Sequence, residues 1–194
     1  MLISGSELLN TPVMSLQTGK ELARTEAAII NPHNLTVIAY LLTGEYLDTS
    51  PSYLRTADIR EIGGLGIIVD SSDEFIIPDD IITEKSIYEL DFLLIDKPVI
   101  DDRRKKLGKV SDYTVDIDSF VIQQLSVKRP LLRSFTDDEL LIGRRQIAEV
   151  TDAKIVVKSG KIKSEKLTAR ASRHYVNPFR QNSPQPETAK SDAH

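Results

Sequence analysis

The chain has 194 residues, with 25 Lys and Arg against 29 Asp and Glu, giving a net charge of −4. It contains no cysteine, which excludes disulfide scaffolds, thiolate zinc sites, thiol nucleophiles and iron–sulfur clusters. No stretch approaches the roughly 18 apolar residues of a membrane span, and no basic, apolar leader opens the sequence. We therefore expect a cytoplasmic protein without an integral membrane segment.

Short β-branched runs bounded by turn residues predict strands along most of the chain. Such runs lie at residues 27–30, 37–42, 66–69 and 75–77. The segment Gln17-Thr18-Gly19-Lys20 is typical of a hairpin turn in which glycine adopts a positive φ. Helical pieces are expected to be short, near residues 5–9, 56–59 and 144–150. Many short strands at this spacing indicate a small barrel or sandwich.

Composition divides the chain into a body and a tail. Leu, Ile, Val and Phe make up 55 of residues 1–160 but only 4 of residues 161–194, too few to bury a core. Charge divides as well: residues 1–86 carry 5 − 13 = −8, residues 87–152 carry 11 − 13 = −2, and residues 153–194 carry 9 − 3 = +6. The tail is therefore predicted to be basic and largely disordered.

The body also contains an internal repeat with an offset near 86 residues. Pro12-Val13 recurs as Pro98-Val99, and residues 20–24 recur as residues 105–109. The further matches are Ile38 and Leu41 with Ile122 and Leu125, residues 59, 61 and 62 with residues 147, 149 and 150, and residues 67–69 with residues 155–157. The drift of a few residues is what loop-length changes produce, so we predict a duplication.

The first copy resembles the PRC-barrel domain family. The resemblance rests on residues 6–13, Thr18-Gly19-Lys20-Glu21-Leu22, residues 27–32, and the later pattern Asp58-Ile59-Arg60-Glu61-Ile62-Gly63. The second copy keeps Pro98-Val99 and residues 107–110 and 155–157, but Val150-Thr151 stands where Ile62-Gly63 aligns. The resemblance implies a mainly all-β chain of two tandem small antiparallel β-barrels, at residues 1–82 and 87–160, followed by the tail 161–194.

Members of that family include the cytoplasmic domain of the photosynthetic reaction-centre H subunit and the C-terminal domain of the ribosome maturation factor RimM. Those with known roles bind other macromolecules. The resemblance therefore implies a non-enzymatic function.

Patterns that would indicate catalysis are weak. Gly63-Gly64-Leu65-Gly66 precedes a β-branched run, whereas a nucleotide-binding loop requires a helix there. The paired acids at 79–80, 101–102 and 137–139 sit in turns, and adjacent residues of a strand point to opposite faces. The three histidines, His33, His174 and His194, have no metal-ligand spacing. We expect no catalytic residue, metal, cofactor or small-molecule substrate, and we assign structural turns to Gly19, Gly63 and Gly108.

Basic residues give the strongest functional signal. Four consecutive cations in the second copy replace the segment that includes Gln17-Thr18-Gly19 in the first, and others follow in the tail. The candidate macromolecule-binding residues are Arg103, Arg104, Lys105, Lys106, Lys161, Lys163, Lys166, Arg170 and Arg173.

These observations favour an adaptor or scaffold protein that binds another protein through its barrels and basic arm. The alternative is an RNA- or ribosome-associated maturation factor similar to RimM, because the same cations would neutralise phosphates. Peripheral membrane association is weaker, since residues 161–180 contain few large apolar side chains.

Overall fold

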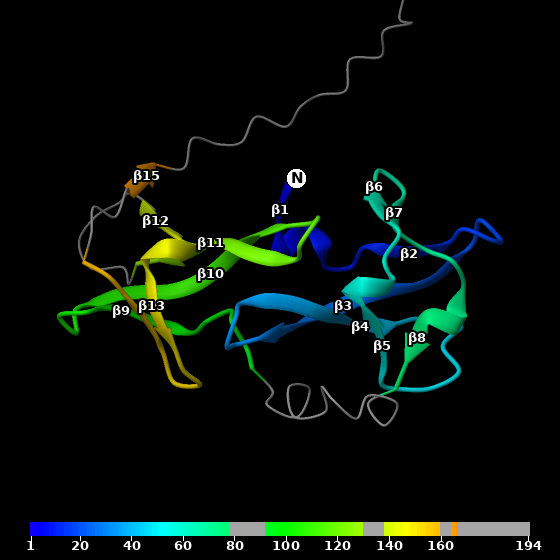
Figure 1. Cartoon of the computed structure of the whole chain (residues 1–194), viewed down its shortest axis with the longest axis horizontal. Helices are drawn as coiled ribbons and strands as arrows, with labels where there is room; N and C mark the ends of the chain where they lie inside the picture. The colour runs from blue at the N-terminus through cyan, green and yellow to red at the C-terminus, as the bar shows by residue number, and fades with distance from the viewer. Residues whose placement is uncertain (78–91, 130–137, 160–163, 167–194) are drawn as a thin grey trace, which may run out of the picture.

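The fold is taken from a computed structural model, which describes residues 1–77, 92–129, 138–159 and 164–166. The chain is mainly β, as the sequence predicts, and its helices are single 3₁₀ turns within the described residues. The elements of residues 1–77 form a first half and those from residue 92 onward form a second half, arranged side by side along the longest axis (Figure 1).

The first half contains eight strands and three 3₁₀ turns. They are β1 Leu2–Ser4, η1 Gly5–Leu8, β2 Pro12–Ser15, β3 Glu21–Asn31, β4 Thr36–Thr43, β5 Ser52–Arg55, η2 Thr56–Asp58, β6 Glu61–Gly63, β7 Gly66–Val69, η3 Ser72–Glu74 and β8 Phe75–Ile76.

The described second half follows the same order. It contains β9 Pro98–Asp101, β10 Lys106–Asp116, β11 Val121–Lys128, β12 Asp138–Gly143, η5 Arg144–Gln146, β13 Ile147–Val150, β14 Ile155–Val157 and β15 Ser164–Lys166. The predicted short helical pieces correspond to η1, η2 and η5, although Ile147–Val150 continues as a strand.

Strand pairing repeats between the halves. In the first half β2 lies between β3, which is antiparallel to it, and β7, which is parallel to it. In the second half β9 lies in the same way between β10 and β14. Each half therefore contains one parallel pair, whereas the sequence predicts antiparallel barrels. The described strand pairs form one sheet and do not close either half into a ring, so closed barrels stay a prediction.

Register identifies equivalent positions of the two halves and corrects two predicted matches. Val37 is opposite Ile30 in β3, and Ile122 is opposite Val115 in β10. Ile122 is thus equivalent to buried Val37 and not to the half-buried Ile38, and Leu125 is likewise equivalent to Tyr40 and not to Leu41. A slip of one residue moves a strand side chain to the other face, and positions 37 and 38 both carry β-branched residues, so the sequence pattern alone did not resolve the slip.

The halves meet at equivalent strands through reciprocal hydrogen bonds. The Val37 amide donates to the Phe120 carbonyl at 2.9 Å, and the Ile122 amide donates to the Leu35 carbonyl at 2.9 Å. Leu35 and Phe120 both have positive φ, 50° and 53°. The junction between β4 and β11 therefore has approximate two-fold symmetry. Arg144 adds a bond from its guanidinium to the Asn34 carbonyl at 2.6 Å.

One apolar core spans this junction. Tyr40 and Val37 of the first half pack in the same cluster as Tyr113, Ile122 and many other residues of the second half. A smaller cluster around Val13, Leu54 and Ile67 belongs to the first half alone. Because a repeat of this length buries little surface by itself, the shared core stabilises both halves.

The N-terminal strand departs from the symmetry. Strand β1 pairs with β10 of the second half, with Leu2 opposite Asp116. The Asp112 carboxylate accepts hydrogen bonds from the Ser4 hydroxyl, the Ser6 hydroxyl at 2.7 Å and the Ser6 amide at 3.2 Å. The N-terminal segment thus spans both halves, which crosses the predicted boundary between two separate domains.

The predicted tail begins too early. Residues Ser164–Lys166 form β15, which pairs with β12, so part of the segment assigned to disorder is a strand. The sequence did not indicate it because the three residues, Ser164-Glu165-Lys166, include no β-branched or aromatic side chain. The tail positions 167–194 and the junction near residues 78–91 lie outside the described residues.

The three glycines assigned to turns have different surroundings. Gly19 has φ 66° in the turn that joins β2 to β3. Gly63 ends β6 and pairs with Gly66. Gly108 lies inside β10 at an irregularity in its pairing with β9, with φ 151°. A Cβ at residue 108 would lie 2.0 Å from the Lys128 carbonyl oxygen, so close strand approach requires this glycine.

Candidate binding surface

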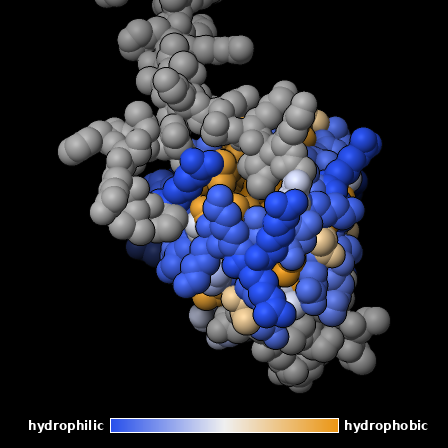
Figure 2. Space-filling model, turned by 90° about the vertical axis from the view of Figure 1, so that its left-hand side faces the viewer, coloured by the Kyte–Doolittle hydropathy of each residue, from blue (hydrophilic) through white to orange (hydrophobic). Residues whose placement is uncertain are grey.

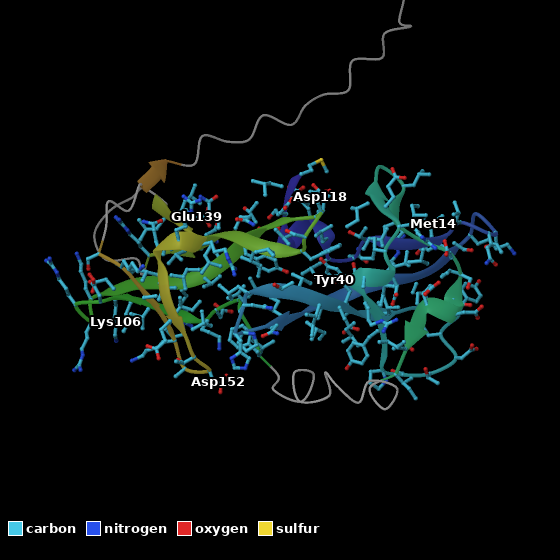
Figure 3. All side chains as sticks on the ribbon, viewed as in Figure 1. Met14, Tyr40, Lys106, Asp118, Glu139 and Asp152 are labelled. Carbon is cyan, nitrogen blue, oxygen red and sulfur yellow. The ribbon has the colours of Figure 1, made fainter. Side chains whose placement is uncertain are left out.

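The four consecutive cations of the second half form the turn between β9 and β10, called here the basic hairpin (Arg103, Arg104, Lys105 and Lys106). All four are exposed. Figure 3 labels Lys106 at the outer end of the second half, far from the junction with the first. The four predicted binding residues that are close in sequence are therefore also close in space, at one tip of the molecule.

A buried carboxylate shapes this turn. One oxygen of Asp101 accepts the amide hydrogens of Arg103 at 2.9 Å and Lys105 at 2.8 Å. In the first half Ser15 accepts the Thr18 amide in the equivalent turn at 3.2 Å. Arg104 has φ 64°, almost the value of Gly19 in that turn. Asp101 is therefore a turn cap, which explains one of the predicted acidic pairs structurally.

A groove beside the basic hairpin has a volume of about 650 Å³. It lies over β9, β10 and the end of β11, and its apolar side chains are Ile95, Pro98, Val99, Ile100 and Val110. Lys106, Lys109, Lys128 and Arg129 also line it, together with Asp96 and Ser111. We call it the second-half groove. Figure 2 faces this end and shows hydrophobic atoms next to hydrophilic residues.

An equivalent but smaller groove of about 330 Å³ lies in the first half. It is lined by Glu21, Leu22, Ala23, Arg24, Thr43, Gly44, Glu45 and Tyr46. By strand register, Glu21 is replaced by Lys106, Arg24 by Lys109, and Thr43 by Lys128. The duplicated position is thus mixed in charge in one half and strongly cationic in the other.

The cations of the second-half groove are not neutralised by described neighbours. In the first half Arg24 forms an ion pair with Glu21 at 2.7 Å. Lys109 is instead directly opposite Lys128 across the β10–β11 pair, an arrangement of like charges that costs stability. Among the residues that the structure describes, Lys106, Lys109, Lys128 and Arg129 form no salt bridge. Glu139, opposite Lys128, accepts a hydrogen bond from Ser111 at 2.5 Å.

A compensating pair of substitutions accompanies the arginine of this groove. In the first half a Cβ on Gly44 would lie 3.2 Å from the Ala23 Cα and 3.6 Å from its methyl group. In the second half Arg129 follows β11 where Gly44 follows β4, and Gly108 replaces Ala23. The second half therefore lacks the methyl group that would contact a side chain at this position.

The other predicted binding residues lie outside the described residues or are described only as backbone. Lys161, Lys163, Arg170 and Arg173 lie outside the described residues, and Lys166 is placed only as backbone in β15. Arg144, also basic and in the same half, donates to backbone carbonyls of Ile122 and Asn34. The groove cations Lys109, Lys128 and Arg129 were not predicted as site residues. Comparison of equivalent repeat positions would have found them.

The remaining patterns have structural roles. The glycine-rich loop is the β6–β7 hairpin turn, with Gly63 opposite Gly66. Asp70 and Arg60 form an ion pair in the first half, with the Arg60 Nε 2.9 Å from the carboxylate. The hydrogen bond from this guanidinium lowers the pKa of Asp70 and raises that of Arg60. Asp116 and Asp118 both contact the amino group of Met1.

Neither a family model nor a curated protein matches the sequence, so the resemblance to PRC-barrel domains stays a prediction. In the part of the chain that is described, no group of three or more His, Asp or Glu side chains is arranged to hold a metal ion. None of the described helices has the length and apolar character needed to cross a membrane.

Proposed function

We propose that this chain is a non-enzymatic adaptor built from two small β-barrels of PRC type, which binds another macromolecule through the basic end of its second half. The partner is a protein with an acidic surface. The basic residues of the C-terminal arm, 161–194, contribute further positive charge to this binding.

One observation carries the proposal. A groove present in both halves carries four cations in the second half, of which three replace non-cationic residues of the first half, and two of the four face each other across a strand pair. Folding gains nothing from like charges at that position. A negatively charged ligand offsets their repulsion, and complementary charge increases both specificity and association rate.

A lysate capture experiment tests the adaptor function. The full chain is immobilised, and captured proteins are identified by mass spectrometry with and without ribonuclease. We expect protein partners that persist after ribonuclease and are lost in the variant R103Q/K105Q/K106Q. A matched variant, K20Q/K154Q/K158Q, removes three lysines outside the basic hairpin and the groove and should retain them.

The RNA-associated alternative makes a different prediction for the same experiment. Ribosomal proteins would dominate the captured set and would disappear after ribonuclease, and binding would weaken steeply with salt. A partner set that is identical for the wild type and both variants would refute a role for the basic end.

A further inference from the structure

We infer that the second-half groove binds an extended acidic peptide segment that carries aliphatic side chains. This inference rests on the proposed function, because it names the chemistry of the partner at the same surface. It concerns a linear segment of the partner rather than a folded surface.

The floor of the groove provides apolar contacts. Ile95 is 43% exposed although it is a large aliphatic residue, and Pro98 beside it is also exposed. Ile95 lies in the turn before β9 and Pro98 begins that strand, and together with Ile100 they form an aliphatic surface within a groove of about 650 Å³. This volume lies in the range of pockets that hold ligands. Burial of leucine or isoleucine side chains of a partner would remove this surface from water.

The rim supplies charge along one side of that floor. On β10, Lys106 is opposite Ile100 and Lys109 is opposite Pro98, and on β11 Lys128 is opposite Lys109, with Arg129 following it. A segment lying along the floor would place its own carboxylates beside these cations. Asp96 is the single acidic side chain among the described residues that line the groove. A peptide of alternating acidic and aliphatic residues matches both the rim and the floor.

The composition of the groove favours peptide over nucleic acid. Binding sites for single strands combine cations with aromatic side chains on which bases stack. The described residues that line this groove include no Phe or Tyr. Its apolar side chains are aliphatic, which suits leucine or isoleucine better than a base. The hollowed shape also differs from the flat polybasic surfaces that bind membranes.

Fluorescence anisotropy with defined probes tests the inference. The full chain is titrated into a labelled decapeptide of alternating Asp and Leu, a decapeptide of alternating Asp and Ser, and a ten-nucleotide oligouridine. We expect the Asp-Leu peptide to bind at least tenfold more tightly than either other probe. Binding should weaken about tenfold in K109Q/K128Q and about tenfold in K106Q/R129Q, and by less than twofold in the charge-matched control K20Q/K154Q.

A third variant separates the floor from the rim. Replacement of exposed Ile95 by alanine should weaken binding of the Asp-Leu peptide at least threefold and leave binding of the Asp-Ser peptide unchanged. Equal binding of the Asp-Leu and Asp-Ser peptides, tighter binding of oligouridine, or equal losses in K109Q/K128Q and K20Q/K154Q would each overturn the inference. Far-UV circular dichroism of each variant verifies that it is folded.

The two proposals fail separately. If no peptide binds but the lysate partners still depend on the basic hairpin, the acidic-peptide inference is wrong and the adaptor function stands. If the lysate partners are captured equally well without the basic hairpin cations, the adaptor function as proposed is wrong, whether or not the peptides bind.

Discussion

The buried tyrosine at the centre of the molecule provides a sharp test of the packing. Tyr40 lies on β4, is 0% exposed and packs in the core that the halves share (Figure 3). Its hydroxyl has no hydrogen-bond partner among the described residues. A buried polar group without a partner costs about 1–3 kcal/mol. Replacement by phenylalanine removes this cost, keeps the ring and leaves space for only one oxygen atom.

We therefore expect Tyr40→Phe to increase the free energy of unfolding by about 1 kcal/mol, and the melting temperature by about 2–4 °C. Urea unfolding followed by circular dichroism measures the change, since the chain has no tryptophan. Tyr46, 78% exposed, gives the control: Tyr46→Phe should change stability by less than about 0.5 kcal/mol. A loss of stability in Tyr40→Phe would refute the reasoning and show that the hydroxyl is bonded, for instance to an ordered water.

The same burial sets the response to alkaline pH. Burial raises the pKa of Tyr40, and also that of Tyr113, above the usual value of 10.0. Between pH 10 and the raised values, the unfolded state loses these protons while the folded state keeps them. The contribution of these two tyrosines to stability is therefore constant below pH 10 and falls above it, by about 1.4 kcal/mol per pH unit for each tyrosine. Tyr40→Phe should remove about half of that slope.

Three further substitutions test other parts of the fold. Gly108→Ala should lower the free energy of unfolding by about 3 kcal/mol or more, because the new Cβ would lie 2.0 Å from the Lys128 carbonyl oxygen. Gly19→Ala should lower it by about 1 kcal/mol, because Gly19 has φ 66° but open space around it. Urea unfolding measures both changes. Equal costs would contradict the close approach. Asp112→Ala should cost about 1–2 kcal/mol and accelerate hydrogen exchange in β1, because it removes three hydrogen bonds to Ser4 and Ser6; unchanged exchange would argue against this anchor. Arg60→Gln should raise the pKa of Asp70 toward 3.8, as measured by carboxyl ¹³C chemical shifts, because the guanidinium lowers it. An unchanged titration curve for Asp70 would show that the ion pair does not cause its lowered pKa.

Local sequence signals predicted local structure well. The turn at Gly19 and the 3₁₀ turns η1, η2 and η5 follow from residue types within a few positions of each other. The repeat also predicted equivalent strands, because matching residues recur at nearly constant offset. Assignment of Ile122 to Ile38 was wrong by one residue, since three β-branched or apolar residues in succession do not define which faces the core.

Features that depend on contacts between distant parts of the chain were harder to predict from the sequence. Nothing in residues 2–4 indicates that their partner strand lies more than a hundred residues away. The sequence predicts that Gly108 is a turn glycine, but the structure requires glycine there because the backbone of β11 lies too close for a Cβ. The groove depends on Lys109 and Lys128, which lie in different strands and become neighbours only through strand register. Charge runs in sequence therefore located one side of the candidate site and missed the other.

The pairing of β1 with β10 has a consequence for how the protein is made. Leu2 leaves the ribosome early, but its partner Asp116 is synthesised 116 − 2 = 114 residues later. At a translation rate of about 5–20 residues per second, roughly 6–23 seconds pass between the synthesis of β1 and that of its partner residues in β10. The hairpins of the first half complete during that interval. The pairing of β1 with β10 is therefore a late step, which follows the synthesis of both strands and the folding of the first-half hairpins.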